Sequence, residues 1–208
     1  MLKMLKDNVK QAIPTKLWVP LLKIKNLIYK LSGAFLYYFY NHCVTNIPVY
    51  KIRHLYLKNI LQIKISNSAS IHMGCFFTGN KISVGDNSVI NRNCYLDGRE
   101  GIQIGANISI SPECYILSLS HQVNDEHFST IGKKVVIEDY CWVGVRGIVL
   151  PGVHLSKGCV VGAGSVVTKS FKENQIIAGS PAKIIGQRTG SYDYSIKYFP
   201  FFDTDITH

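Results

Sequence analysis

The sequence of 208 residues contains no C-x-x-C pair, although it has six cysteines. A zinc site built from closely spaced cysteines is therefore excluded. No apolar run followed by small residues comes after Met1, so we expect no secretory leader and a cytoplasmic protein with reduced thiols. Five cysteines occupy one place in a repeat described below, which predicts small, buried packing residues: Cys75, Cys94, Cys114, Cys141 and Cys159.

The sequence also lacks an apolar run of the roughly 20 residues needed to cross a bilayer. Its most apolar stretch, Leu27 to Tyr40, is interrupted by Lys30. Residues 1–62 are aromatic and rich in lysine, and we expect them to form a helical segment that caps the open end of the core. One alternative stays open, in which residues 1–60 make a peripheral contact with an anionic membrane surface at the inner face.

Acidic residues are few, with 13 Asp and Glu against 23 Lys and Arg, which gives a formal charge of +10. This excess suits anionic partners, including a phosphate-bearing cosubstrate. Basic patches interleaved with aromatics and known nucleic-acid-binding motifs are absent, so we expect no nucleic-acid partner. The length allows one main domain with appendages and excludes a second enzyme module.

A repeat of six residues is the main feature that is present. An apolar residue returns every sixth position, a period that fits neither a helix nor an ordinary strand. The repeats form groups of three that occupy 18 residues each, and the longest interruption places fifteen residues between His121 and Ile137. The apolar marker positions are Ile65, Ile71, Phe77, Val84, Ile90, Leu96, Ile104, Ile110, Ile116, Ile137, Val143, Val149, Leu155, Val161 and Val167.

Three short strands joined by turns close a triangular coil whose markers point inward. Successive coils stack as parallel strands about 4.8 Å apart. The pattern predicts an all-β solenoid of about five coils at residues 63–176, followed by a C-terminal extension at 177–208. The aromatic end of this extension is expected to pack on the body or on a neighbour.

Three features resemble a known family. The marker register is one, and the second is His121 after a serine-containing strand, followed by an excursion and the strand Cys141-Trp142-Val143-Gly144. The third is the exit motif AGSPAKIIGQR at 178–188. Together they resemble the hexapeptide-repeat acetyltransferases, and most closely the branch of maltose, galactoside and colanic-acid or capsular sugar O-acetyltransferases.

This resemblance implies a left-handed parallel β-helix, a homotrimer with active sites between subunits, and acetyl-CoA as cosubstrate. The implied reaction is transfer of acetyl to a sugar hydroxyl in surface-polysaccharide biosynthesis. His121 closes the third coil and, by the resemblance, is the general base, since imidazole titrates near working pH. Asp125 and Glu126 are candidates for orienting it.

The resemblance also implies a donor site on the late coils, where Lys169 and Lys183 face the phosphates. Lys183 stands where the family often has arginine, so it would act as a point charge. The expected acetyl-CoA contacts are Trp142, Gly144, Val145, Ala163, Thr168, Lys169 and Lys183. The expected acceptor contacts, which could equally be polar residues at solvent-facing corners, are Asn91, Asn93, Asp97 and Arg99.

No metal is expected. The γ-class carbonic anhydrases share this fold and bind zinc through three histidines, but the spacing of His121 and His127 differs from theirs and His72 lies two coils away. Two kinds of alternative function remain. One is another acceptor, as in amino-sugar N-acetyltransferases or antibiotic acetyltransferases. The other is a non-catalytic β-helix scaffold or a membrane-surface assembly protein.

Overall fold

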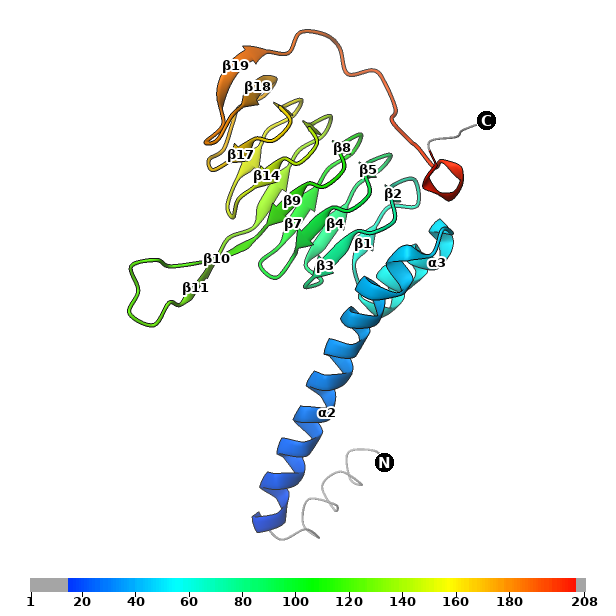
Figure 1. Ribbon diagram of the computed structural model, residues 1–208, viewed down its shortest axis with the longest axis vertical. Coiled ribbons are helices and arrows are strands. Elements are labelled where there is room, and N and C mark those ends of the chain that lie inside the picture. The colour runs from blue at the N-terminus through cyan, green and yellow to red at the C-terminus, as the bar shows by residue number, and fades with distance from the viewer. Residues whose placement is uncertain (1–14, 205–208) are drawn as a thin grey trace, which may run out of the picture. The chain divides into compact units, whose positions relative to one another are not determined.

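The computed structural model describes residues 15–204, and the chain divides into two compact units, residues 1–38 and residues 39–208. Helix α2 (Thr15–His42) crosses this division. The second unit contains shorter helical segments and a stack of parallel coils (Figure 1). The helical segments are η1 (Val44–Asn46), α3 (Tyr50–Leu55), the π-helical turn η2 (Tyr56–Ile60) and η3 (Phe201–Asp203).

Each coil contributes one short strand to each of three parallel sheets. The first sheet consists of β1 (Lys64–Ile65), β4 (Ile82–Val84), β7 (Ile102–Ile104), β12 (Val135–Ile137) and β15 (His154–Leu155). The second consists of β2 (Ser70–Ile71), β5 (Val89–Ile90), β8 (Ser109–Ile110), β13 (Trp142–Val143), β16 (Val160–Val161) and β18 (Gln175–Ala178), with β19 (Lys183–Gln187) added antiparallel. The third consists of β3 (Phe76–Thr78), β6 (Tyr95–Asp97), β9 (Tyr115–Leu117), β14 (Ile148–Val149) and β17 (Val166–Val167).

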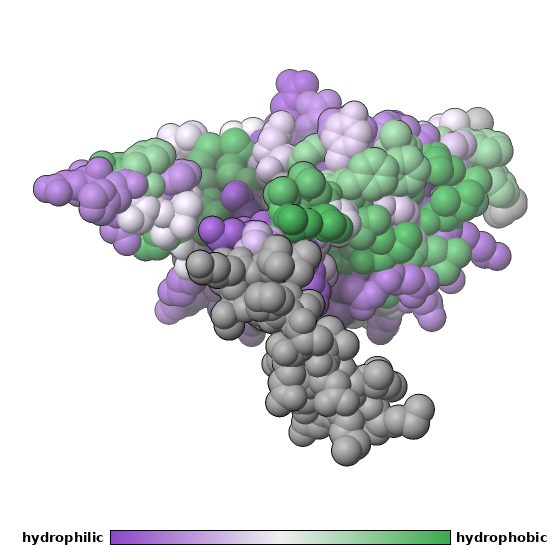
Figure 2. Space-filling view, turned by 90° about the horizontal axis from the view of Figure 1, so that it is seen from below, coloured by the Kyte–Doolittle hydropathy of each residue, from purple (hydrophilic) through white to green (hydrophobic). Residues whose placement is uncertain are grey.

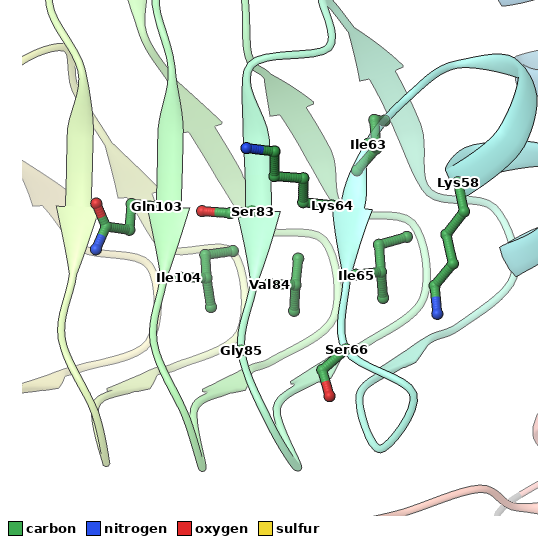
Figure 3. Close-up of a pocket in the computed structure, with 10 residues that line it drawn as sticks. All are labelled: Lys58, Ile63, Lys64, Ile65, Ser66, Ser83, Val84, Gly85, Gln103 and Ile104. Carbon is green, nitrogen blue, oxygen red and sulfur yellow. The ribbon is translucent and has the colours of Figure 1, made fainter.

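All marker residues point into the solenoid, and none is more than 8% exposed. Figure 3 shows one column of them, Ile65, Val84 and Ile104, on neighbouring strands of the first sheet. The predicted left-handed parallel β-helix of about five coils is confirmed. The pattern also continues farther than expected. Phe171 forms a parallel β-bridge with Leu155, and six residues later Ile177 of β18 pairs with Val161. A partial sixth coil therefore closes the C-terminal end.

The five repeat cysteines are buried, as predicted, and all six cysteines are free thiols. Cys75, Cys94 and Cys114 stack at one corner in successive coils. The thiol of each donates a hydrogen bond to a backbone carbonyl of the next coil. Cys75 Sγ lies 3.1 Å from Asn91 O, and Cys94 Sγ lies 3.2 Å from Ser111 O. Small side chains at this place let the chain turn tightly while the carbonyl remains paired.

Residues 39–61 cover the first coil. The Asn41 amide both donates to and accepts from the backbone of Phe77, each at 2.9 Å, and so replaces the hydrogen bonds of a missing coil. Thr45 Oγ1 donates to Cys75 O at 2.8 Å, and Tyr40 packs edge-on against Phe77. This part of the N-terminal segment therefore caps the open edge that a solenoid would otherwise expose.

The tail after β19 returns from the last coil to the first (Figure 1). Tyr192 stacks on Tyr140, and Tyr198 stacks on His72 in the first coil. The tail thus packs on the body. Among residues 15–204, no helix combines the length and apolarity that a membrane crossing requires. The domain bounds at 62/63 and 176/177 stay predictions, and β18 spans the second of them.

Candidate functional site

The longest interruption of the repeat is an antiparallel hairpin formed by β10 (Leu119–His121) and β11 (Thr130–Gly132). Lys133 N donates a hydrogen bond to Ser118 O at 2.9 Å. The coil therefore leaves the wall after Ser118 and resumes beside it at Lys133. His121 was expected to close the third coil, and this placement is wrong by three residues. The coil ends at Ser118, and His121 stands at the end of β10, opposite Thr130.

The hairpin holds the His121 ring from one side. Nδ1 lies 3.0 Å from the carbonyl oxygen of Phe128, and the Phe128 ring stacks on the imidazole at 4.2 Å between centroids. A carbonyl only accepts, so Nδ1 must carry the proton and Nε2 keeps its lone pair in the neutral ring. Since the residue is exposed, this tautomer presents a base to the surroundings.

The loop itself is held by Asp125. Its carboxylate accepts from the backbone N–H groups of His127 and Ser129, each at 3.1 Å. Hydrogen bonding from Ser129, and then from the His127 backbone, lowers the pKa of Asp125, so its carboxylate stays ionised at neutral pH. The group at His121 Nδ1 is thus a carbonyl and neither of the two expected carboxylates, Asp125 and Glu126. Figure 2 shows the hairpin as the hydrophilic projection at the left.

Asp97 and Arg99 lie beside the point where the hairpin leaves the wall. Asp97 pairs with Leu117 in the next coil, and Ser118 N donates to Asp97 O at 3.2 Å. The guanidinium of Arg99 binds the Asp97 carboxylate through Nε at 2.9 Å and Nη2 at 2.7 Å. Burial raises the pKa of Asp97, but the hydrogen bonds from Arg99 outweigh it and hold this pKa below its usual value.

Only one member of this pair can meet a ligand directly. The Asp97 side chain is 2% exposed and also accepts from Thr78 Oγ1 at 3.1 Å, whereas the Arg99 side chain is 51% exposed. The carboxylate is therefore committed to the protein. The geometry makes the Arg99 guanidinium the hydrogen-bond donor that faces outward, and the Asp97 carboxylate is the group that positions it.

Most residues expected to contact acetyl-CoA lie at or beside the corner between the second and third sheets. Trp142 is half exposed and its Nε1 donates to Ser111 Oγ at 3.0 Å. Val145 and Ala163 are exposed on successive turns. A Cβ at Gly144 would come within 2.7 Å of Ala163 N, so the missing side chain of Gly144 allows close stacking of the coils.

The remaining predicted residues divide between corners. Asn91 and Asn93 follow β5 at the corner that also carries Gly144, Val145 and Ala163. Thr168 and Lys169 follow β17 at the corner between the third and first sheets, which also carries Arg99 and the hairpin, while the exposed Lys183 lies on β19. Within one chain the third sheet separates the two groups, so the structure does not gather all predicted residues in one pocket.

Two hollows lie on the surface of the solenoid. A hollow on the outer face of the first sheet is lined by Lys58, Lys64, Ser83 and Gln103 among others, and none of the predicted site residues lines it (Figure 3). A smaller one, of about 240 Å³, has Trp142 beside the tail residues Tyr194 and Ile196.

Two other histidines, His72 and His154, have structural partners. His154 Nε2 lies 2.6 Å from Glu138 Oε1, and His72 is buried between Tyr50 and Tyr198. Residues 15–204 contain no cluster of three or more His, Cys, Asp or Glu side chains suited to a metal ion.

The sequence is similar to those of known proteins. Residues 134–169 match the family model described as the hexapeptide repeat of succinyl-transferase. The chain is 35% identical over 108 residues to the putative colanic acid biosynthesis acetyltransferase WcaF of Escherichia coli strain K12, covering 52% of this chain and 59% of the relative. It is 29% identical over 166 residues to the galactoside O-acetyltransferase of the same strain, covering 75% and 77%.

The fold has relatives among solved structures. A galactoside acetyltransferase in complex with coenzyme A superposes with a TM-score of 0.67 at 26% identity, covering 81% of this chain and 88% of that one. The chain spans about half the length of the curated relatives that it first matches. These matches confirm the resemblance predicted from the motifs: the chain carries the hexapeptide repeat and has the fold of the hexapeptide-repeat acetyltransferases.

Proposed function

We propose that this protein transfers acetyl from acetyl-CoA to a sugar hydroxyl, with His121 as general base. The observation that carries the proposal is the contact between His121 Nδ1 and the Phe128 carbonyl, which leaves Nε2 ready to accept a proton. The galactoside acetyltransferase that superposes on this chain was solved with coenzyme A. A galactoside O-acetyltransferase is also among the proteins similar to this chain in sequence. The relative named for colanic acid biosynthesis supports an acceptor used in surface polysaccharide.

In the proposed reaction, Nε2 of His121 takes the proton of the acceptor hydroxyl while its oxygen attacks the thioester carbonyl carbon. The tetrahedral intermediate then expels the CoA thiolate, and the imidazolium returns the proton to the sulfur. Base catalysis of this kind contributes about 10² to 10⁴ in rate. Phe128 and Asp125 take no proton in this scheme and keep the imidazole oriented.

Binding of the two substrates is assigned as follows. The donor lies along the late coils, where the exposed lysines Lys169 and Lys183 meet its phosphates and Trp142 borders its path. The acceptor lies near Arg99, which Asp97 holds in place, with Asn91 and Asn93 as further contacts. Gly144, Val145, Ala163 and Thr168 complete the donor contacts that we propose.

We also propose that the active unit is a homotrimer. The residues assigned to each substrate are divided between two corners of one chain, so a neighbouring copy is needed to bring the corner of Gly144, Val145 and Ala163 against a hairpin. The outer face of the third sheet, which lies between these corners, carries the stacked rings of Phe76, Tyr95 and Tyr115. Light scattering of the purified chain should give the mass of three copies.

The function is tested by incubating the full chain with labelled acetyl-CoA and a panel of sugars and amino sugars. The proposal predicts a labelled ester, which mild alkali removes. An alkali-stable amide would establish N-acetylation. Absence both of transfer and of CoA binding by calorimetry would favour the scaffold alternative and overturn the proposal.

A further inference from the structure

Helix α2 exposes an apolar stripe that the proposed reaction does not use. We define this stripe as Ile24, Leu27, Ile28 and Leu31, whose spacing places them on one side of the helix. Their exposed fractions lie between 53% and 60%. Phe35 and Tyr38 continue the same side and are also exposed.

The C-terminal end of the helix packs by a different side. At about 100° per residue, Tyr40 lies roughly opposite to the stripe. Tyr40 belongs to the second unit and is fully buried there against Tyr56 and Phe77. Large apolar side chains on the outward side of a helix mark an interaction surface.

Lysines border the stripe on both sides. On the same projection Lys23 and Lys30 lie along one edge and Lys25 along the other, and all three are exposed. The surrounding sequence adds to this charge, because residues 8–85 contain ten Lys and Arg and no Asp or Glu. An apolar stripe between cations is the arrangement of a helix that lies in a lipid interface, where lysines extend to the headgroups.

The charges also favour lipid over the other occupants. A second copy of α2 would bring like charges together at both edges of the stripe, without an acidic residue to balance them. A membrane crossing is not supported, because no helix within residues 15–204 has the required length and apolarity. An anionic bilayer supplies both an apolar layer for the stripe and negative headgroups for the lysines.

We propose that the apolar stripe of α2 inserts into the surface of a bilayer that contains anionic phospholipid, with the helix axis in the membrane plane. This surface is separate from the residues assigned to acetyl transfer. Its failure would therefore leave the proposed reaction untouched.

The test is flotation of the full chain with vesicles of phosphatidylcholine alone or mixed with phosphatidylglycerol. The wild-type chain should float with the mixed vesicles, and added salt should weaken the binding. Leu31→Glu should weaken it by about tenfold or more, because a charge then replaces an inserted side chain. Ile28→Glu is the second variant if the first fails to fold by circular dichroism.

Asn26→Glu is the matched control, since it adds the same charge at an exposed position roughly opposite the stripe. It should retain most of the binding. Equal losses in Leu31→Glu and Asn26→Glu would overturn the insertion of the stripe. Equal binding to both kinds of vesicle would overturn the role of anionic headgroups. Absence of vesicle binding together with a changed oligomer mass in Leu31→Glu would show that protein covers this face and would also overturn the proposal.

Discussion

Position 85 has to be a glycine because the neighbouring coil lies too close for a side chain. A Cβ there would lie 2.5 Å from the carbonyl oxygen of Gly105 in the next coil, and backbone cannot move aside locally. Gly85→Ala should therefore lower the free energy of unfolding by about 1 to 3 kcal/mol, measured by urea denaturation. Gly33→Ala is the control, because its Cβ would meet nothing within 4 Å on a helix. It should be neutral or slightly stabilising, and equal losses would refute the stacking argument.

The buried carboxylate of Asp97 should make stability depend on pH. Its pKa is lowered in the folded chain, so its contribution is present above the unfolded value of about 3.9 and is lost as the pH falls through the folded value. Asp97→Asn should be less stable than wild type by about 1 to 2 kcal/mol at neutral pH. Its stability should fall less steeply on acidification, and parallel curves for the two proteins would contradict this assignment.

The hairpin was the element that the sequence located best and described least. Fifteen residues without the repeat marked its place and pointed to His121. The orienting partner could not be predicted, because a carbonyl belongs to every residue and only the folded loop brings the one of Phe128 to Nδ1. The register of the coil was misjudged at Ser118 for a related reason, since serines on both sides of the boundary fit the repeat equally well.

Asp125 should act on the reaction through the shape of this hairpin. Asp125→Ala removes the acceptor for two backbone N–H groups, which should misplace His121 and lower kcat by about 10- to 100-fold. The Kd for CoA should not change. Asp125→Asn should recover part of the rate, because its amide oxygen still accepts. Glu126→Ala is the control for charge, and if it lowered kcat equally, the loop geometry would not be the cause.

The three-sheet solenoid followed from the marker period alone, because each marker has to be buried and each coil has the same length. The return of the tail could not be predicted in detail. The sequence shows aromatic residues after 188, but it does not show that Asp203 enters a buried site near the first coil. There its carboxylate accepts from Met73 N at 2.5 Å and lies 3.4 Å from Arg53 Nη2.

The tail should therefore stabilise the whole molecule through this ion pair. Asp203→Ala leaves the fully buried Arg53 without its carboxylate partner and should cost about 3 to 5 kcal/mol in the free energy of unfolding. The exposed Asp193 of the same tail is the control, and its alanine variant should change stability by less than about 0.5 kcal/mol. Matching unfolding curves for wild type and Asp203→Ala would exclude this tail contact.

The division of the site between two corners is also a property of the whole molecule. The resemblance assigned the acetyl-CoA residues and the acceptor residues one by one. The stacking of coils then placed members of each set on both sides of the third sheet. The central claim is that His121 removes the acceptor proton without holding the donor. It is tested most directly by comparing His121→Ala with His127→Ala, an exposed histidine of the same hairpin.

In this measurement, acetyl transfer and the Kd for CoA are determined for both variants and the wild type. The account predicts that kcat/KM for the acceptor falls by about 10² to 10⁴ in His121→Ala, that the Kd for CoA stays unchanged, and that His127→Ala resembles the wild type. Turnover retained by His121→Ala, or an equal loss in both variants, would contradict the assignment of His121 as the base.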